Sequence, residues 1–234
     1  MLGVRGISPA RLRMGRRQIV MVFTETPENN INYEYGSYNS GNQAGRITKQ
    51  EDINGIQQFT YGLLGEILTE KKTMIVPFDS IYTFKTRTRY DTWNRIDTII
   101  YPDGEIVKYF YNEGGQLKKM TGVKGNQTFN YIRTLGYDKF ESRSFLRYGD
   151  NTETKTTYDS RRRHLNRLQV VSPNINHTLL DNRYTFDGVD NILTIKNHVS
   201  PYNTVGGATS YSFGYDSSYR LTGGTGYDLS LIHI

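Results

Sequence analysis

A seven-residue motif that recurs along the chain constrains its fold more than any other feature of the sequence. The motif begins with Tyr or Phe and, in most copies, continues with Asp or Asn, has Gly, Asn or Asp in fifth place and ends with Ile or Leu. A typical copy is YDTWNRI. The copies begin at Tyr61, Tyr90, Tyr111, Tyr137, Tyr158, Phe186 and Tyr215. Such regular recurrence predicts a repeat architecture, in which each unit contacts mainly its neighbours.

Each position of the motif suits the end of one strand, a tight turn or the start of the next strand. The aromatic residue closes a strand, and the Asp or Asn side chain can accept a hydrogen bond from the backbone two residues later, which starts a turn. Gly, Asn or Asp in fifth place tolerates a positive φ. The fifth place holds Glu141, Arg162 and Tyr219 in three copies, where we expect longer turns or turns of type I.

The clearest hairpin in the sequence lies between residues 90 and 122. Residues 95–101 and 105–111 are rich in β-branched and aromatic residues, and Pro102-Asp103-Gly104 between them favours a turn. Tyr109 and Tyr111 should face one side of the sheet and Phe110 the other, so neither face is expected to be fully dry. Further turn signals at 123–126, 148–151 and 205–207 divide the intervals between motif copies into two strands.

The fold class that follows is all-β, an array of antiparallel hairpins stacked edge to edge. No stretch shows a capped apolar face of helical period over a dozen residues, so we expect no long helix. A single hairpin is marginally stable in water, so the hairpins must pair with one another. The 234 residues suffice for one large all-β domain or two smaller ones.

Composition excludes several classes of protein. The chain has no cysteine, which excludes disulfides and Cys-based zinc or nucleophile chemistry. Of the 29 Lys and Arg residues, five lie in residues 1–22, and the remaining 24 nearly balance 23 Asp and Glu. The body of the chain is therefore close to neutral, and we expect no nucleic-acid partner. The longest apolar run near the start, residues 19–23, is too short for a membrane span.

No catalytic, cofactor-binding or metal-binding residue is predicted. His164, His177, His198 and His233 are isolated in the sequence and lack metal-ligand spacing. The second-place acids suit turns, and a hydrolase would need two of them to converge across a cleft. These acids are Asp91, Asp138, Asp159, Asp187 and Asp216. The basic run 161–163 is interpreted as a solvated loop that lengthens one turn.

The motif resembles the YD repeat of the RHS family, whose units read roughly Tyr-Asp-x-x-Gly-Arg-Leu followed by a hairpin. The stretches 136–163 and 184–197 are similar to RHS proteins of Bacteroidetes-type bacteria, and the resemblance covers about residues 32–228. It implies a spiralling sheet that forms part of a β-cocoon, as in the shells of insecticidal toxin complexes and polymorphic toxins. In that family the shell encloses a C-terminal toxin released by a self-cleaving segment. No residue here matches that segment.

The resemblance therefore implies a non-catalytic shell fragment, secreted or at the cell surface of a bacterium. Its partners would be the rest of its own shell and an encapsulated C-terminal toxin absent from this chain, without a cofactor. The alternative is a cell-surface module that binds carbohydrate through exposed tyrosines; a β-rich hydrolase is a further alternative. Residues 1–31 are expected to be unstructured or artefactual. Residues 229–234, LSLIHI, translate a transposase adapter used in sequencing libraries and are expected to be an adapter-derived tail.

Overall fold

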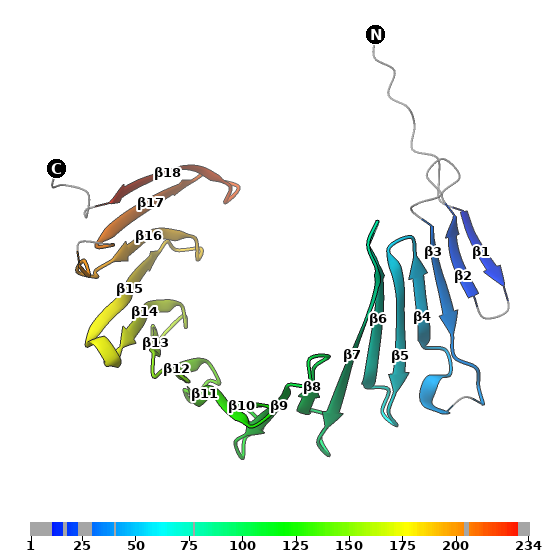
Figure 1. Ribbon diagram of the computed structural model, residues 1–234. Coiled ribbons are helices and arrows are strands. Elements are labelled where there is room, and N and C mark those ends of the chain that lie inside the picture. The colour runs from blue at the N-terminus through cyan, green and yellow to red at the C-terminus, as the bar shows by residue number, and fades with distance from the viewer. Residues whose placement is uncertain are drawn as a thin grey trace, which may run out of the picture. The chain divides into compact units, whose positions relative to one another are not determined.

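The fold is all-β, as the sequence predicted. The computed structural model describes residues 30–39, 41–76, 78–203 and 206–228, together with the backbone of residues 11–15 and 18–22. Two compact units divide the chain: Met1–Tyr109 with Gly122–Gln127, and Phe110–Thr121 with Thr128–Ile234. Each unit contains antiparallel strands joined by short turns (Figure 1).

In the first unit, each strand from β1 to β9 pairs antiparallel with the next along the chain (Figure 1). These strands are β1 (Arg11–Gly15), β2 (Gln18–Val22), β3 (Ile31–Tyr35), β4 (Ile47–Asp52), β5 (Gly55–Tyr61), β6 (Ile67–Ile75), β7 (Ile81–Tyr90), β8 (Ile96–Ile100) and β9 (Ile106–Tyr111). A short 3-10 helix, η2 (Gly41–Gln43), lies between β3 and β4. The β8 and β9 strands confirm the hairpin predicted at 95–111.

In the second unit, consecutive strands from β11 to β18 likewise pair antiparallel. These strands are β11 (Gln127–Tyr137), β12 (Arg143–Tyr148), β13 (Glu153–Tyr158), β14 (Leu165–Ser172), β15 (His177–Phe186), β16 (Ile192–Asn197), β17 (Thr209–Tyr215) and β18 (Leu221–Asp228). The 3-10 helix η3 (Pro173–Ile175) joins β14 to β15. Strand β10 (Leu117–Lys124) has residues in both units, as do β9 and β11. Within the described residues, no helix is long and apolar enough to cross a membrane.

Strand lengths show a larger period that we did not predict. The long strands β7, β11 and β15 have 10, 11 and 10 residues, and the strands that follow them, β8, β12 and β16, have 5, 6 and 6. The structural unit is therefore four strands, or two copies of the sequence motif. A signal was present in the sequence, because successive motif copies from Tyr90 to Phe186 begin 21, 26, 21 and 28 residues apart.

Few side chains are fully buried, as expected for a sheet that is only partly dry on each face. Among the described residues, the buried hydrophobic side chains are Val107, Leu135, Leu146 and Val199. In β9, Tyr109 and Tyr111 are half-buried whereas Phe110 is exposed, which agrees with the predicted faces. Many large hydrophobic side chains remain exposed. Pairing of strands, rather than a thick apolar core, therefore provides most of the contacts.

The segments 1–31 and 229–234 were expected to lie outside the β-array. The segment 1–31, expected to be unstructured or artefactual, contains strands β1 and β2, and β2 pairs with β3. The other residues of that segment up to 29 lie outside the described residues, as does the whole of 229–234.

Candidate functional site

The recurring motif forms a tight turn whose hydrogen bonds repeat from copy to copy. In the Tyr90 copy, the Asp91 N–H donates to the Arg95 carbonyl at 2.9 Å, and the Asn94 N–H donates to the Asp91 carbonyl at 3.0 Å. The ladder shifts register beside this turn, between Arg89 and Tyr90. This pattern is a three-residue hairpin loop with a bulge, whose last loop residue adopts a left-handed conformation.

The fifth position is left-handed even where the residue disfavours it. Its φ is 89° at Gly65, 60° at Asn94, 84° at Gly115, 65° at Glu141, 78° at Asp190 and 61° at Tyr219. The turns at Glu141 and Tyr219 are no longer than the others, because each fifth-place N–H donates to the second-place carbonyl at 3.0 Å as Asn94 does. In the Tyr158 copy the turn is one residue longer, as predicted, and Arg163 takes the left-handed conformation with φ 64°.

The second-place aspartates hold these turns through their carboxylates, as the sequence predicted. Asp187 Oδ1 accepts hydrogen bonds from the backbone N–H groups of Val189 and Asn191, each at 2.9 Å. The Asn191 side-chain amide donates to Asp187 Oδ2 at 2.8 Å, and this bond and the backbone bonds lower the Asp187 pKa. Burial raises the pKa of the other four second-place aspartates, but the hydrogen bonds that their carboxylates accept lower it by more, so that the net pKa is lowered. These four are Asp91, Asp138, Asp159 and Asp216.

The first-place tyrosines link consecutive turns along one side of the strands. Tyr137 closes β11, and its hydroxyl donates at 2.9 Å to the carbonyl of Leu117, which follows the preceding turn. Equivalent bonds join Tyr61 to Ile47 (2.5 Å), Tyr90 to Ile67 (3.1 Å), Tyr158 to Arg143 (3.1 Å) and Tyr215 to Ile192 (3.0 Å). A hydroxyl at this position therefore fixes each turn relative to the one before it.

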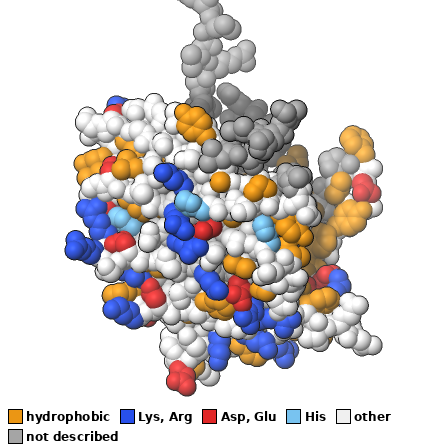
Figure 2. Space-filling model, turned by 90° about the vertical axis from the view of Figure 1, so that its left-hand side faces the viewer, with side chains coloured by type: hydrophobic (Ala, Val, Ile, Leu, Met, Phe, Trp, Pro, Cys, Tyr) orange, Lys and Arg blue, Asp and Glu red, His pale blue; other side chains and the backbone are white. Residues whose placement is uncertain are grey.

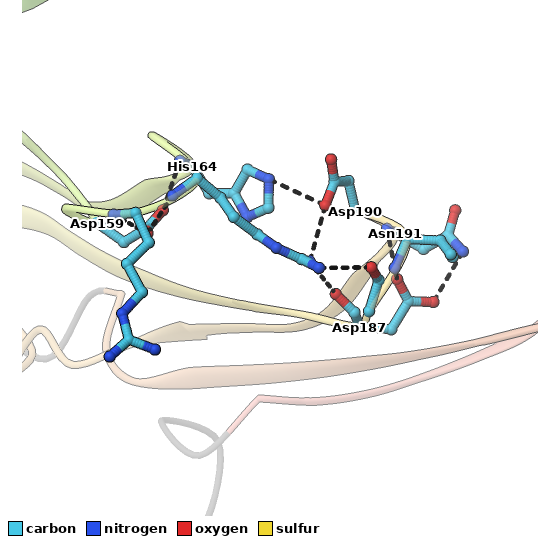
Figure 3. A network of polar contacts seen from close by, with 9 residues as sticks. Asp159, His164, Asp187, Asp190 and Asn191 are labelled. Atoms are coloured by element: carbon cyan, nitrogen blue, oxygen red, sulfur yellow. Dashed lines mark hydrogen bonds and ion pairs between the residues drawn. The ribbon is translucent and has the colours of Figure 1, made fainter.

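The basic run 161–163, predicted to be a solvated loop, joins three successive turns of the second unit. Arg162 reaches forward, and its Nη1 lies 3.1 Å from the Asp187 carbonyl and 3.0 Å from Asp190 Oδ1 (Figure 3). Arg163 reaches backward to pair with Asp138, and its guanidinium lies 4.4 Å from the Phe140 ring centroid. Arg161 and Arg162 are exposed, as expected for a solvated loop, whereas Arg163 is half-buried. Arg162 and Arg163 in addition contact the neighbouring turns.

His164 completes this polar cluster. Its Nε2 lies 3.2 Å from Asp190 Oδ1, and its backbone N–H donates to Asp159 Oδ2 at 2.7 Å (Figure 3). Its ring centroid is 4.5 Å from that of Phe186. A hollow of about 230 Å³ lies beside the cluster, lined by Asp159, Arg162, His164, Asn166, Tyr184, Thr185, Phe186 and Asp187. The aspartates here accept bonds within the protein, so the cluster holds turns together.

Two carboxylates that the sequence did not single out are buried. Glu153 and Asp181 are only 9% and 7% exposed. Arg147 donates to Glu153 across strands at 2.9 Å from Nε, and Arg167 binds both oxygens of Asp181, at 2.5 and 2.9 Å. The bonds from these arginines lower the pKa of both acids. The sequence shows no local signal for these pairs, because their partners lie on neighbouring strands.

The remaining histidines do not form a metal centre within the described part of the chain. His177 packs against Tyr202, with ring centroids 4.9 Å apart, and His198 donates its backbone N–H to the Asp181 carbonyl at 2.9 Å. His233 lies outside the described residues. No group of three His, Cys, Asp or Glu side chains close enough to hold a metal occurs among the residues described. Figure 2 shows basic, acidic and hydrophobic side chains interspersed on the face that it views.

Known proteins match this chain in structure but not in sequence. No protein-family model matches the chain, and no curated protein matches it significantly. Crystal structures of TcdB2-TccC3, with and without Cdc42, match 88% of the chain with a TM-score of 0.75 and 18% identity. The Tc holotoxin pore of Photorhabdus luminescens matches 88% of the chain with a TM-score of 0.69 and 19% identity.

These neighbours define the type of fold. The strands of this chain are arranged as in the matching regions of TcdB2-TccC3 and of the Tc holotoxin pore. The chain spans only 11% of the TcdB2-TccC3 chain and 10% of the holotoxin chain. At this level of identity the similarity establishes the fold alone.

Proposed function

We propose that this chain is a wall segment of an RHS-type shell, which encloses a toxin domain that the chain itself does not contain. The observation that carries the proposal is the match to the TcdB2-TccC3 shell over 88% of the chain at a TM-score of 0.75. The partners would be further repeats of the same shell and the enclosed toxin. The parent protein would be exported from a bacterial cell, to the medium or to the cell surface.

The chemistry of the repeats supports a scaffold rather than a catalyst. The second-place aspartates accept hydrogen bonds from their own turns, and the buried acids Glu153 and Asp181 are paired with arginines. A carboxyl group that acts as a general acid or nucleophile must be presented to a substrate. Carboxylates engaged in this way instead fix turns and register, which suits a wall built from many similar units.

The gene of the parent protein provides the first test of this proposal. Sequencing outward from the region that encodes residues 32–228 should reveal further copies of the motif on both sides. It should also reveal a C-terminal domain whose sequence varies between strains. A parent without further repeats, or with an unrelated enzyme domain fused directly to residues 32–228, would contradict the shell role.

A further inference from the structure

The alternation of long and short strands leaves part of a strand edge unpaired in the first unit. Strand β7 pairs with β6 from Ile81 to Arg87, but its pairing with β8 begins only at Arg87. Residues 81–86 therefore have no partner strand on the β8 side among the described residues. Alternate residues of a strand direct their N–H and C=O groups to opposite sides. Several backbone donors and acceptors of these residues consequently have no partner in β8.

An apolar groove lies beside this free edge. It has a volume of about 530 Å³ and is lined by Thr83, Phe84, Tyr101, Pro102, Asp103 and Glu105. The Phe84 and Tyr101 side chains are 43% and 38% exposed. Residues 81–85 of β7 are all exposed as well. An unpaired edge next to exposed aromatic rings combines the two features by which sheets recruit extended peptides.

The second unit shows how the equivalent edge is filled. Strand β15 pairs with β16 only from Asn182 onward, which leaves residues 177–181 without β16 as a partner. There, the His198 N–H donates to the Asp181 carbonyl at 2.9 Å, and the Tyr202 ring packs on His177. Val199 of the same segment is 7% exposed. The protein therefore covers this edge with its own segment, residues 198–202, which contributes a backbone N–H from His198 and the aromatic ring of Tyr202.

Residues 198–202, which cover the edge of β15, belong to the loop after β16. In the first unit the corresponding connection is the turn after β8, which lines the apolar groove. In the four-strand unit, the loop after β16 takes the place of the turns after β8 and β12. The turn after β8 consists of Pro102-Asp103-Gly104 and closes with the Tyr101 N–H donating to the Glu105 carbonyl at 2.8 Å. Such a short turn cannot reach along β7. The unpaired edge of β15 is therefore covered by residues 198–202, whereas the corresponding edge of β7 has no such covering segment among the described residues.

We propose that the free edge of β7 at residues 81–86 binds an extended polypeptide segment as an added β-strand, with an aromatic side chain of that segment seated against Phe84 and Tyr101. Like residues 198–202, the occupant supplies backbone N–H groups to the edge and an aromatic side chain, and it adds apolar side chains for the groove. A second groove of about 520 Å³ lies beside β11. There the Gly149 N–H already donates to the Tyr131 carbonyl at 3.1 Å, so the edge is shorter and β7 is the better site.

A defined peptide tests this site on the 234-residue chain. The probe is a fluorescein-labelled peptide of eleven residues in which Tyr and Val alternate with Thr and Lys. The control peptide has the same composition except that proline replaces alternate residues, which removes the N–H groups that pair with an edge. Fluorescence polarisation should show saturable binding of the first peptide below about 1 mM and none of the second. Amide hydrogen exchange at residues 81–86 should slow when the peptide is bound.

Substitutions of the groove aromatics test where the peptide binds. Phe84→Ala and Tyr101→Ala should each weaken binding about tenfold, because an aromatic ring buried on binding contributes on the order of that factor. Tyr227→Ala, at an exposed tyrosine of β18, is the matched control and should leave binding unchanged.

The proposal would be overturned by the absence of saturable binding, by binding without protection of residues 81–86, or by equal binding of the proline peptide. Protection of residues 81–86 that rises with protein concentration in the absence of peptide would also overturn it, in favour of pairing between two copies. None of these results depends on whether the parent protein forms a shell.

Discussion

At the scale of single residues, most copies of the repeat combine a left-handed residue in fifth place with a carboxylate or amide in second place. The fifth-place residue varies between copies, but the turn keeps its conformation, because the φ angles of Glu141 and Tyr219 are near those of Asn94 and Gly115. The second-place residue varies as well. Asn112 Oδ1 accepts a hydrogen bond from the backbone N–H of Gln116 at 2.9 Å, as the aspartates do in other copies. Turn geometry is therefore more uniform than turn sequence.

Replacing a strained fifth-place residue by glycine should stabilise the protein. A left-handed conformation costs a residue with a Cβ about 1–2 kcal/mol, whereas glycine adopts it freely but loses more entropy on folding. Glu141→Gly and Tyr219→Gly should therefore each raise the free energy of unfolding by about 0.5–1 kcal/mol, measured by urea denaturation. As a control, Gly115→Ala should lower it. A fall in stability for both glycine variants would show that these residues are not strained.

The lowered pKa of the turn aspartates predicts how stability depends on pH. A carboxyl whose pKa is lower in the folded than in the unfolded chain stabilises the fold above the unfolded pKa, for which 3.8 is the ordinary aspartate value. This contribution is lost as the pH falls through the lowered folded pKa. Asp187→Asn keeps an acceptor but does not titrate, so its free energy of unfolding should fall less steeply with acidification than that of the parent sequence. Equal slopes in acid titrations followed by circular dichroism would contradict this role.

At the scale of structural elements, side chains join each turn to the next. Tyrosine hydroxyls make the more regular contacts, and Arg162 and Arg163 add links on both sides of the longest turn. In the copy at Phe186, where no hydroxyl exists, the ring instead packs on His164. Each hairpin therefore acquires its register from its neighbour as well as from its own turn.

Removing one of these hydroxyls tests the link between turns. Tyr137→Phe and Tyr215→Phe keep the ring but lose the bond to a carbonyl, so each should cost about 0.5–1.5 kcal/mol of unfolding free energy. Tyr211→Phe, at a tyrosine that is 44% exposed in β17, should change it by less than about 0.5 kcal/mol. Indistinguishable unfolding midpoints for all three variants would mean that the hydroxyl bonds contribute nothing to register.

The arginine run offers a second test of the links between turns. Arg163 pairs with Asp138 and stacks on Phe140, so Arg163→Ala should destabilise the protein by about 1–2 kcal/mol. In the described part of the chain only the backbone of Arg161 takes part in these contacts, so Arg161→Ala is the control. Amide exchange in the turn 138–142 should accelerate in the first variant alone. Equal acceleration in both would assign the effect to net charge.

At the scale of the whole molecule, the sequence allowed the fold class to be predicted because the motif encodes it locally. Tyr, Asp and the fifth-place residue specify a strand end and a turn within seven residues. Between two copies, the β-branched and aromatic residues of β8 and β9 and the Pro-Asp-Gly turn at 102–104 specify a hairpin equally locally. The four-strand period, the buried Glu153 and Asp181 and the groove beside β7 did not follow. Each depends on which residues of different strands lie opposite one another, and this register is set by pairing over the whole unit.

The most direct test of the proposed shell is an electron cryomicroscopy map of the full-length parent protein. We predict that residues 32–228 form part of a continuous wall of antiparallel strands, and that this wall surrounds density for a separate C-terminal domain. A map in which the repeats form an open array, with the C-terminal domain outside and exposed to solvent, would contradict the proposal.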